Sequence, residues 1–408
     1  MTHDSRTITL PSLIDCHVHF REPGLEHKGT MATEAAAALA GGVTTVCEMP
    51  NTKPPTVTVA AFADKVRRAE SLKTQDTRYK NFDIRFFFGV TEMGHLEELR
   101  SLWTDPAHAT LKARCCGVKL YLDHSTGNQK AEDVVVEEAF RTCAELDCLI
   151  VAHCEDADIN AAALMNVTRD PASPRLRGAG MGHGTTVDLH SRARPPESEE
   201  KSIRDAIAMA KKYGTRFHIA HLSTKGGLDT VRAAKKEGLP VTCEVAPHHL
   251  FLTTDDYATL GTLVKMNPPL RTKDHQEALW EGITDGTIDC CATDHAPHTL
   301  EEKRGGNPLG TPSGVPGVAT MLPLLITVAA GKWPGPKLQT ANYKLQTIDI
   351  VRLCFTNHNR IFRLGKDPSA VHTTIDPDAE WIIRGRDLPS KCGWSPYEGW
   401  RVWGKIIH

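Results

Sequence analysis

The fold is indicated most clearly by residues 117–153, which read GVKLYLDHSTGNQKAEDVVVEEAFRTCAELDCLIVAH. The apolar runs at 117–122 and 149–153 are typical of buried strands, and residues 132–146 between them have the spacing of an amphipathic helix. Two neighbouring strands joined through a helix run parallel, because the helix carries the chain back to the edge where the first strand began. The stretch therefore predicts one β-α-β unit of a parallel sheet.

The same alternation of strand and helix extends along most of the chain. Strands are predicted at residues 12–16, 43–48, 84–90, 117–122, 149–153, 216–221, 241–245 and 288–293. Helices are predicted between them, at residues 31–40, 57–72, 132–146, 197–213, 226–236 and 274–282. Eight repeats favour a closed barrel over an open sheet, which would carry a glycine-rich phosphate loop that this sequence lacks. We therefore expect an α/β fold, a distorted (β/α)8 TIM barrel.

The domain organisation follows from where this alternation stops. The barrel is expected to span residues 12–370. The tail at 371–408 contains short strand-like runs, and we expect it to form a small β appendage on the barrel together with residues 1–11. Residues 170–196 are rich in Pro, Gly, Arg and His and are long for a connection between a strand and a helix, which favours a functional excursion over a linker.

Composition and charge exclude several classes of protein. The chain has 408 residues with 48 Lys and Arg against 50 Asp and Glu, a formal charge of −2 that provides no basic surface for nucleic acid or an acidic membrane. The longest apolar stretch, 318–330, is shorter than the roughly 20 residues of a membrane span. Residues 1–10 lack the apolar core of a secretory signal, and none of the 12 cysteines forms a C-x-x-C pair. We therefore expect a cytoplasmic protein with reduced thiols, and neither nucleic acid nor a membrane as partner.

Residues that bind metal ions lie at the ends of several predicted strands. Asp15, His17 and His19 alternate along the first strand, so we expect them on one face. Three more potential ligands close later strands, namely His153, His221 and Asp294. A lone histidine is more often structural than a ligand, but the carboxyl ends of barrel strands converge at one mouth, which makes the joint pattern specific. Imidazole and carboxylate groups without thiolates indicate a catalytic site for zinc or a related divalent ion.

Lys119 lies within the apolar fourth strand, where alternation places it with Tyr121 on the face opposite Val118 and Leu120. An ammonium group inside a barrel lined with metal ions would be disfavoured by desolvation and by repulsion. Two interpretations stay open. Lys119 either reaches solvent or an acidic neighbour at the mouth, or loses its proton, takes up carbon dioxide and becomes an anionic carbamate that bridges two metal ions.

The potential ligands belong to longer motifs. The most particular are Asp15-Cys-His-Val-His-Phe-Arg-Glu-Pro-Gly and Glu48-Met-Pro-Asn-Thr-Lys-Pro. Others are Gly117-Val-Lys-Leu-Tyr-Leu, Val151-Ala-His-Cys-Glu, Cys243-Glu-Val-Ala-Pro-His-His-Leu, Ala292-Thr-Asp-His-Ala-Pro-His with the following Glu301-Glu-Lys, and Ser390-Lys-Cys-Gly-Trp-Ser-Pro-Tyr-Glu-Gly. Together they resemble the dihydroorotases of the amidohydrolase superfamily. The resemblance implies a barrel of the metal-dependent amidohydrolase type, with a reduced β appendage because only 16 residues precede His17.

The resemblance implies a centre of two divalent ions, most commonly zinc. His17, His19, Asp294 and a carboxylated Lys119 would hold the buried ion, and Lys119 with His153 and His221 the outer one. The implied reaction is the reversible cyclisation of N-carbamoyl-L-aspartate to L-dihydroorotate in pyrimidine biosynthesis, with activated water as the nucleophile and Asp294 as general acid and base. Three interpretations of Glu244, His248 and His249 stay open: support of the ligands from behind, which we favour, an additional metal site, or structure at the end of the barrel. A homodimer is typical of such proteins.

The resemblance also assigns residues to the substrate. Arg21 would bind the substrate carboxylate, and the other substrate-binding positions would be Asn51, Asn267, His298, Pro316 and Gly317. From the residues alone, Arg21 equally suits an ion pair with its neighbour Glu22. Some relatives carry an arginine at the position of Asn267, and Arg271 either replaces it or pairs with Asp274. A lid loop over the substrate is predicted at His124, Ser125, Thr126 and Gly127.

Two other functions compete with this one. An allantoinase or a hydantoinase has the same scaffold, and the segment Arg192-Ala-Arg-Pro-Pro-Glu resembles a hydantoinase. A hydantoin ring, however, lacks the exocyclic carboxylate that Arg21 and Asn51 would bind. A catalytically inactive scaffold protein would lack metal ligands, whereas this sequence carries the full predicted set.

Overall fold

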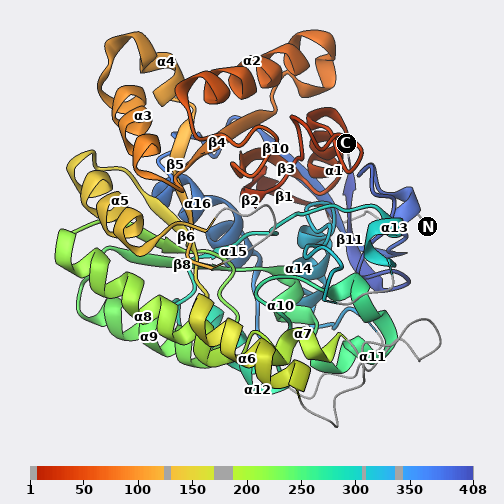
Figure 1. Ribbon diagram of the computed structural model, residues 1–408. Coiled ribbons are helices and arrows are strands. Elements are labelled where there is room, and N and C mark those ends of the chain that lie inside the picture. Colours follow the sequence, from red (N-terminus) through yellow and green to blue (C-terminus); the bar gives the residue numbers. More distant parts are fainter. Residues whose placement is uncertain (1–6, 124–129, 170–186, 306–308, 336–342, 408) are drawn as a thin grey trace, which may run out of the picture.

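The computed structural model describes residues 7–123, 130–169, 187–305, 309–335 and 343–407. Eight parallel strands lie side by side in chain order: β2 (Leu13–Val18), β3 (Val43–Glu48), β4 (Asp83–Gly89), β5 (Cys115–Tyr121), β6 (Ile150–His153), β7 (Phe217–Ile219), β8 (Val241–Val245) and β9 (Cys290–Cys291). A parallel bridge between Val18 and His295, four residues after β9, joins the two edges of the sheet. The sheet is therefore a nearly closed barrel, which confirms the predicted α/β fold (Figure 1).

Helices cover the outside of this barrel (Figure 1). The longer ones are α1 (Met31–Ala40), α2 (Val59–Gln75), α3 (Met93–Thr104), α5 (Asp133–Glu145), α6 (Ala157–Arg169), α8 (Pro196–Tyr213), α9 (Lys225–Lys236), α12 (Lys273–Thr284) and α14 (Met321–Ala329). Shorter ones are α4 (Ala109–Lys112), α7 (Asp188–Arg192), α10 (Pro247–Phe251), α11 (Tyr257–Leu260), α13 (Leu300–Lys303), α15 (Thr347–Val351) and α16 (Asn357–Ile361). Local signals fix their ends: Thr30 caps α1 by accepting from the N–H of Thr33, and Gly214 ends α8 in the left-handed conformation.

Apolar side chains form cores on both faces of the sheet. Between the strands and the helices lie residues such as Phe86, Val118 and Ile219. Inside the barrel the alternate strand positions are filled by Ile14, Cys16, Cys47, Phe87, Cys116 and Val151. All twelve cysteines are free, and most are buried in these two cores. The barrel is thus packed below the ends of its strands, so a site for small molecules is left at the mouth.

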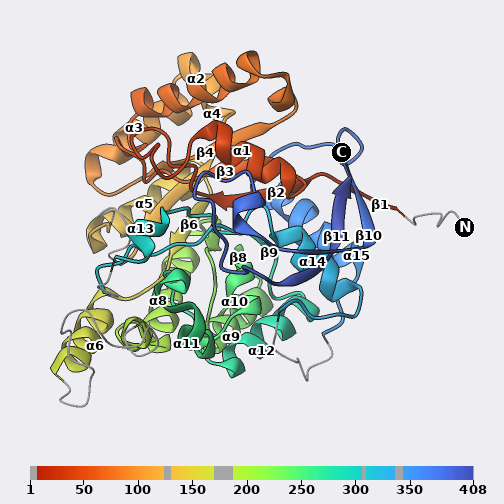
Figure 2. The ribbon, with the colours of Figure 1, turned by 90° about the vertical axis from the view of Figure 1, so that its right-hand side faces the viewer.

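A second, antiparallel sheet joins the two ends of the chain. It consists of β1 (Ile8–Pro11), β10 (His372–Ile382) and β11 (Arg401–Ile407), with β10 in the middle. Helix α14 packs against it, and a side chain at Gly404 would overlap Ile326, since an added Cβ would lie 2.5 Å from Ile326 Cγ2. Figure 2 shows this sheet at one side of the molecule, next to α14.

The domain boundaries at residues 12–370 and 371–408 stay a prediction. None of the described helices is long and apolar enough to cross a membrane.

Candidate metal centre and active site

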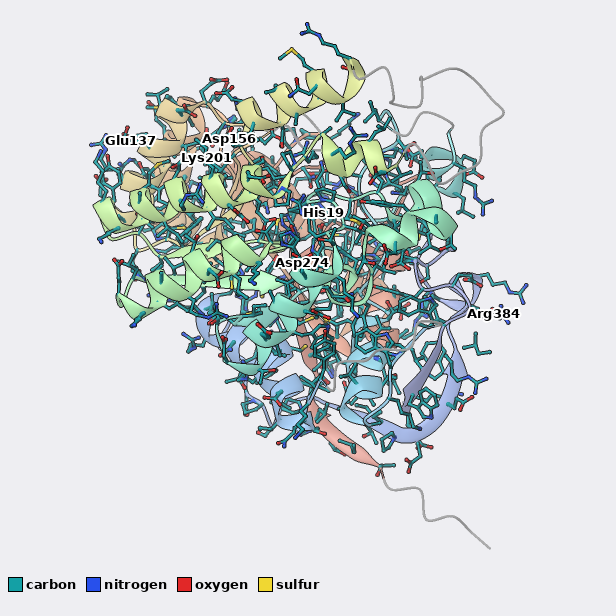
Figure 3. All side chains as sticks on the ribbon, turned by 90° about the horizontal axis from the view of Figure 1, so that it is seen from below. His19, Glu137, Asp156, Lys201, Asp274 and Arg384 are labelled. Carbon is teal, nitrogen blue, oxygen red and sulfur yellow. The ribbon has the colours of Figure 1, made fainter. Side chains whose placement is uncertain are left out.

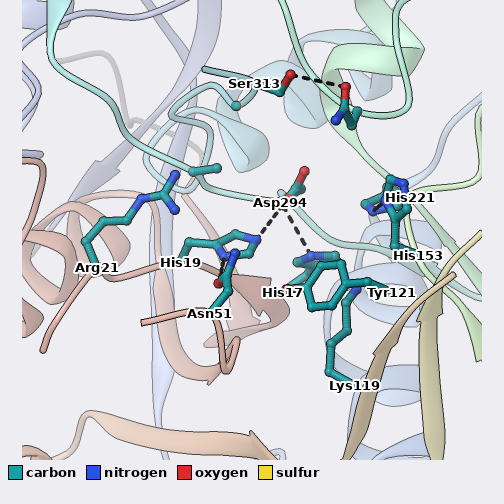
Figure 4. A pocket seen from close by; sticks show the side chains of 13 residues that line it. His17, His19, Arg21, Asn51, Lys119, Tyr121, His153, His221, Asp294 and Ser313 are labelled. Atoms are coloured by element: carbon teal, nitrogen blue, oxygen red, sulfur yellow. Dashed lines mark hydrogen bonds and ion pairs between the residues drawn. The ribbon is translucent and has the colours of Figure 1, made fainter. Parts of the chain in front are cut away.

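A pocket opens where the carboxyl ends of the barrel strands meet (Figure 4). It holds about 390 Å³ of empty space and is lined by His17, His19, Arg21, Asn51, Lys119, Tyr121, His153, His221, Asn267, Asp294, Ala296, Ser313 and Gly314. The six predicted metal ligands all belong to this lining. Charged side chains such as Glu137 and Lys201 lie at the surface, whereas His19 is buried in the interior (Figure 3). The polar side chains that line the pocket are therefore shielded from bulk water.

The first group of potential ligands is His17, His19 and Asp294. One carboxylate oxygen of Asp294, Oδ1, lies 3.2 Å from His17 Nε2 and 3.0 Å from His19 Nε2. Two donor atoms bound to one tetrahedral zinc at about 2.0 to 2.1 Å lie roughly 3.3 Å apart. The three side chains thus hold their donor atoms close to the spacing that a shared metal ion requires (Figure 4).

The second group is His153 and His221, on the other side of Asp294 (Figure 4). Their facing nitrogens, His153 Nδ1 and His221 Nε2, are 3.1 Å apart. The two groups are contiguous, because the rings of His17 and His221 lie 5.2 Å apart between centroids. Donor atoms of His17, His221 and Asp294 all lie within 4.8 Å of one another. These three residues form a possible metal site.

Three of the four imidazoles are oriented by a further side chain, whereas His221 Nδ1 has no hydrogen-bond partner among the described residues. Glu244 Oε1 lies 2.5 Å from His17 Nδ1, and Asn51 Oδ1 lies 2.7 Å from His19 Nδ1. The carboxylate of Glu155 lies 2.8 Å from His153 Nε2. Such partners fix the ring orientation of a ligating histidine. The structure thus places Glu244 behind a potential ligand, as the sequence predicted.

Lys119 extends into the same space from β5. Its side chain is buried, and Nζ has no hydrogen-bond partner within the described part of the chain. Burial lowers the pKa of Lys119 to about 8, although Glu244 and Asp294 oppose the shift. A lysine in this state reaches its neutral form close to neutral pH. The possibilities that Lys119 reaches solvent or pairs with an acid do not apply to this arrangement.

The charge states of the ligands suit metal binding. Burial lowers the pKa of His19 to about 4, so its imidazole is neutral at physiological pH. Burial by itself would raise the pKa of Asp294, but His17 and His19 beside it hold that pKa well below its usual range. Asp294 is therefore ionised. Neutral imidazole and ionised carboxylate are the forms that ligate metals.

Three residues of the pocket have a backbone conformation that is unusual for a residue with a side chain. The φ angles are 70° at Arg21, 33° at His221 and 45° at Asp294. A positive φ costs roughly 1 to 3 kcal/mol for a residue with a Cβ and persists only where the surroundings enforce it. The strain coincides with the ends of β2, β7 and β9, where the chain turns side chains into the pocket.

Arg21 presents a buried guanidinium to the pocket. Its Nε donates to Pro297 O at 3.0 Å, and within the described ranges it forms no ion pair with a carboxylate. The alternative pairing with Glu22 is not seen, because Glu22 contacts Arg68 instead. An unpaired buried cation favours the binding of an anion.

Arg21 Nη2 is free to donate to a ligand, because the facing nitrogen of His298 carries a proton. Burial and the nearby Arg21 lower the pKa of His298 to about 3, so the ring is neutral. The ammonium of Lys28 lies 3.0 Å from His298 Nδ1 and can only donate, so Nδ1 accepts and Nε2 carries the proton. Nε2 then donates to Ser313 O at 3.1 Å. Arg21 Nη2, 3.1 Å from the protonated Nε2, finds no acceptor there and keeps its protons for a ligand.

The other predicted substrate positions differ in their placement. Asn51 and Asn267 line the pocket, whereas His298 lies behind Arg21, and Pro316 and Gly317 are outside the lining. The predicted lid, His124, Ser125, Thr126 and Gly127, falls outside the described residues.

Several neighbours of the site have other partners than the sequence suggested. Asp15 accepts from the N–H and the hydroxyl of Thr293 behind the pocket, and Arg271 donates to Ser223 Oγ and Arg194 O rather than pairing with Asp274. Four lining residues were not among the predicted site residues, namely Tyr121, Ala296, Ser313 and Gly314. The sequence placed Tyr121 on the strand face of Lys119 but assigned it no role in the site.

Known proteins resemble this chain along nearly its whole length. The sequence profile of the family described as dihydro-orotase-like matches residues 6–227. A dihydroorotase of Halobacterium salinarum is 37% identical over 391 residues, which cover 96% of this chain and 82% of that protein. The chain belongs to the dihydroorotase-like family. A second dihydroorotase, from Methanosarcina mazei, is 35% identical to this family member over 408 residues, covering 96% of this chain and 80% of that protein.

Solved structures with a similar fold include cyclic amidohydrolases. An L-hydantoinase (dihydropyrimidinase) from Arthrobacter aurescens superimposes with a TM-score of 0.83 and 25% identity, covering 98% of this dihydroorotase-like chain and 83% of that one. A dihydropyrimidinase from Brevibacillus agri has a TM-score of 0.78 at 21% identity, with coverage of 98% and 83%. The second likeness concerns the fold alone. Both agree with a distorted barrel of the amidohydrolase type.

Proposed function

We propose that this protein is a metal-dependent dihydroorotase that interconverts N-carbamoyl-L-aspartate and L-dihydroorotate. The observation that carries the proposal is Arg21, a buried guanidinium that faces the pocket without a carboxylate partner in the described chain. A bidentate arginine suits a substrate carboxylate. Among cyclic amides, dihydroorotate carries such a group on its ring, whereas hydantoin does not. The curated relatives named dihydroorotase support the same substrate.

The donor set fits two divalent ions, most commonly zinc. His17, His19 and Asp294 would hold one ion and His153 with His221 the other, with Lys119 between them. Lys119 has a buried, unpartnered amine whose pKa is lowered to about 8. Addition of this neutral amine to carbon dioxide would release a proton and give a carbamate, which would serve as an anionic metal ligand. When bound, the ions supply a Lewis acid for the substrate carbonyl and lower the pKa of water.

Asp294 is the residue that moves the proton. Its ionised carboxylate accepts a proton from the attacking water in the hydrolytic direction and donates it to the departing ring nitrogen. In the direction of ring closure the same carboxylate accepts the proton of the ureido nitrogen and returns it to the leaving oxygen. His17 and His19 hold Asp294 in place through the contacts at 3.2 and 3.0 Å.

The substrate carboxylate is held beside this centre. Arg21 offers its Nη groups, and Asn51 adds its amide nitrogen, because its oxygen is engaged by His19. Asn267 lies across the pocket with its oxygen bonded to Ser313 Oγ at 3.1 Å, so its amide nitrogen is also directed to a ligand. A cytoplasmic location and a homodimer remain predictions.

The proposal is tested by assaying the purified protein with dihydroorotate, N-carbamoyl-L-aspartate, hydantoin and allantoin side by side. We expect turnover of the first two and a kcat/KM at least about 100-fold lower for rings without a carboxylate, since the Arg21 contact is then lost. Equal or better turnover of hydantoin or allantoin would favour the hydantoinase-type function that the Arthrobacter aurescens structure suggests.

Arg21 itself provides a sharper test. Replacement by Ala should lower kcat/KM for dihydroorotate by about 1000-fold, because a buried charge-assisted pair is lost, while the metal content measured by mass spectrometry stays unchanged. Arg68→Ala is the matched control, since Arg68 binds only surface carboxylates, those of Asp64 and Glu22. An Arg21→Ala protein with normal turnover would contradict the assignment.

A further inference from the structure

Lys303 lies fully buried behind the wall of the pocket that Ser313 and Gly314 form. Its ammonium donates to three main-chain carbonyls, to Lys265 O at 2.8 Å, to Pro312 O at 3.1 Å and to Gly314 O at 3.0 Å. An ammonium group has three protons, so every one of them finds an acceptor. The side chain at the end of α13 thus holds the main chain of the pocket wall on both sides of Ser313.

A second buried lysine extends this arrangement. Lys265 Nζ donates to Leu309 O at 2.8 Å and to Thr311 O at 2.5 Å. The main chain of Lys265 also takes part, because its carbonyl accepts from the N–H of Gly314 at 3.0 Å. The two ammonium groups together fix the path of residues 309–314 as it passes the pocket. This segment is not part of a helix or a strand, so it has no regular hydrogen bonds of its own.

Neither ammonium group forms an ion pair with a carboxylate among the residues that the structure describes. Buried lysines in proteins are usually paired, because an isolated buried charge is costly. Among the described residues both amines donate to main-chain carbonyls, and Lys303 Nζ also lies 5.9 Å from the centre of the Trp394 ring. Burial and the neighbouring Lys265 lower the pKa of Lys303 well below its usual range, and burial lowers the pKa of Lys265 to about 8. Hydrogen bonds to the main chain of the pocket wall, rather than ion pairs, therefore hold both side chains.

We propose that Lys303 is a positioning residue for substrate binding. Its ammonium holds Ser313 and Gly314 against the substrate, opposite the metal ligands, while Arg21 binds the substrate carboxylate. Ser313 in turn orients Asn267 through its hydroxyl. Loss of the Lys303 ammonium removes this donor from Pro312 O and Gly314 O, while Lys265 O keeps the N–H of Gly314, and lets the wall move, which weakens binding more than it slows the chemical step at Asp294. The inference rests on the proposed dihydroorotase activity.

The test compares the steady-state kinetics of Lys303→Met and Lys303→Gln with the unchanged protein, using dihydroorotate and the metal-loaded full chain. Methionine keeps the volume and removes all donors, so KM should rise about tenfold while kcat falls less than about threefold. Glutamine keeps an N–H donor without the charge and should give an intermediate KM. Metal content should be equal in all three proteins.

Chemical rescue separates hydrogen bonding from mere filling of space. In Lys303→Ala, added propylammonium should restore KM toward its original value in a concentration-dependent way, because it carries the missing N–H donors. Tetramethylammonium has the same charge but no donor and should not restore KM. The rescue of Lys303→Ala also tests the role of Lys303 if Lys303→Met fails to fold.

Lys235→Met is the matched control. Lys235 donates to a main-chain carbonyl, Thr287 O at 2.7 Å, and in addition pairs with Asp289 at 2.6 Å, at the opposite end of the barrel, before β9. This variant should lose stability without a change in KM. If the unchanged protein turns over dihydroorotate and the variants at Lys303 keep KM within about twofold, or if tetramethylammonium rescues as well as propylammonium, the role of Lys303 is wrong. An unchanged protein without that turnover would instead refute the proposed function.

Discussion

Gly314 lies where the pocket wall passes closest to the loop after β9. Its φ is 134°, and an added Cβ would lie 2.8 Å from Ala296 Cβ and 3.2 Å from His298 Nε2. Gly314→Ala should therefore displace the wall and lower kcat/KM for dihydroorotate by at least about tenfold. The bound metal should stay, because the three atoms nearest to the new methyl group belong to Ala296 and His298, which are not predicted ligands.

Gly238→Ala is the control for this prediction. Gly238 also has a positive φ, 76°, but nothing lies within 4 Å of an added Cβ. Gly238→Ala should lower the stability, measured as a lower midpoint of urea unfolding, and leave the kinetics unchanged. Equal loss of activity in the two variants would show that the crowding at Gly314 is unimportant.

Single residues differ in how far the sequence predicted them. His17, His19, His153, His221 and Asp294 were predicted because each follows a strand whose end is visible as an apolar run. The partners of Arg21 were not predicted, because its positive φ turns the side chain away from Glu22 and towards Pro297. Residue types alone do not encode such a local backbone reversal.

The segment between β10 and β11, residues 390–397, acts as one element that supports the loop after β9, which carries Pro297 and His298 beside Arg21. Ser390 Oγ donates to Glu34 on α1 at 2.6 Å, and the same carboxylate lies 2.8 Å from His295 Nε2. Further along, the indole N–H of Trp394 donates to His298 O at 2.7 Å. The closing motif of the sequence therefore holds the loop after β9 from outside the barrel.

Trp394→Phe removes this indole donor and keeps most of the packing. We expect KM for dihydroorotate to rise about fivefold, since a buried hydrogen bond contributes about 1 kcal/mol. Trp381→Phe is the matched control, because its indole donates to Gly404 O at 3.4 Å within the small sheet. Comparable kinetics for the two variants would refute the supporting role of Trp394.

The elements of the barrel were largely predictable, for a physical reason. Buried parallel strands are apolar on both faces and stand out as short continuous runs, as in β3 and β8, whose observed bounds equal the predicted ones. Helix α3 was not predicted, although its buried Leu96, Leu99 and Leu102 recur every three residues. Strand β9 is shorter than the predicted 288–293, because the chain leaves the sheet to form the site.

At the scale of the whole molecule, closure of the barrel brings residues near the start and the end of the sheet together. His19 N–H donates to His295 O at 2.7 Å across this closure, which sets His19 beside Asp294. The convergence of side chains from five strands was predictable, because every parallel strand of a barrel ends at the same mouth. The support from α13 and the closing segment was not, because it depends on irregular chain that has no periodic signal.

We propose that two ions and a carboxylated Lys119 occupy this mouth. Crystals of the zinc-loaded protein, measured on both sides of the zinc absorption edge, test it most directly. We expect two anomalous peaks, one beside His17, His19 and Asp294 and one beside His153 and His221, with extra density bonded to Lys119 Nζ between them. A single peak remote from Lys119, or an unmodified Lys119 beside a metal-free pocket, would contradict it.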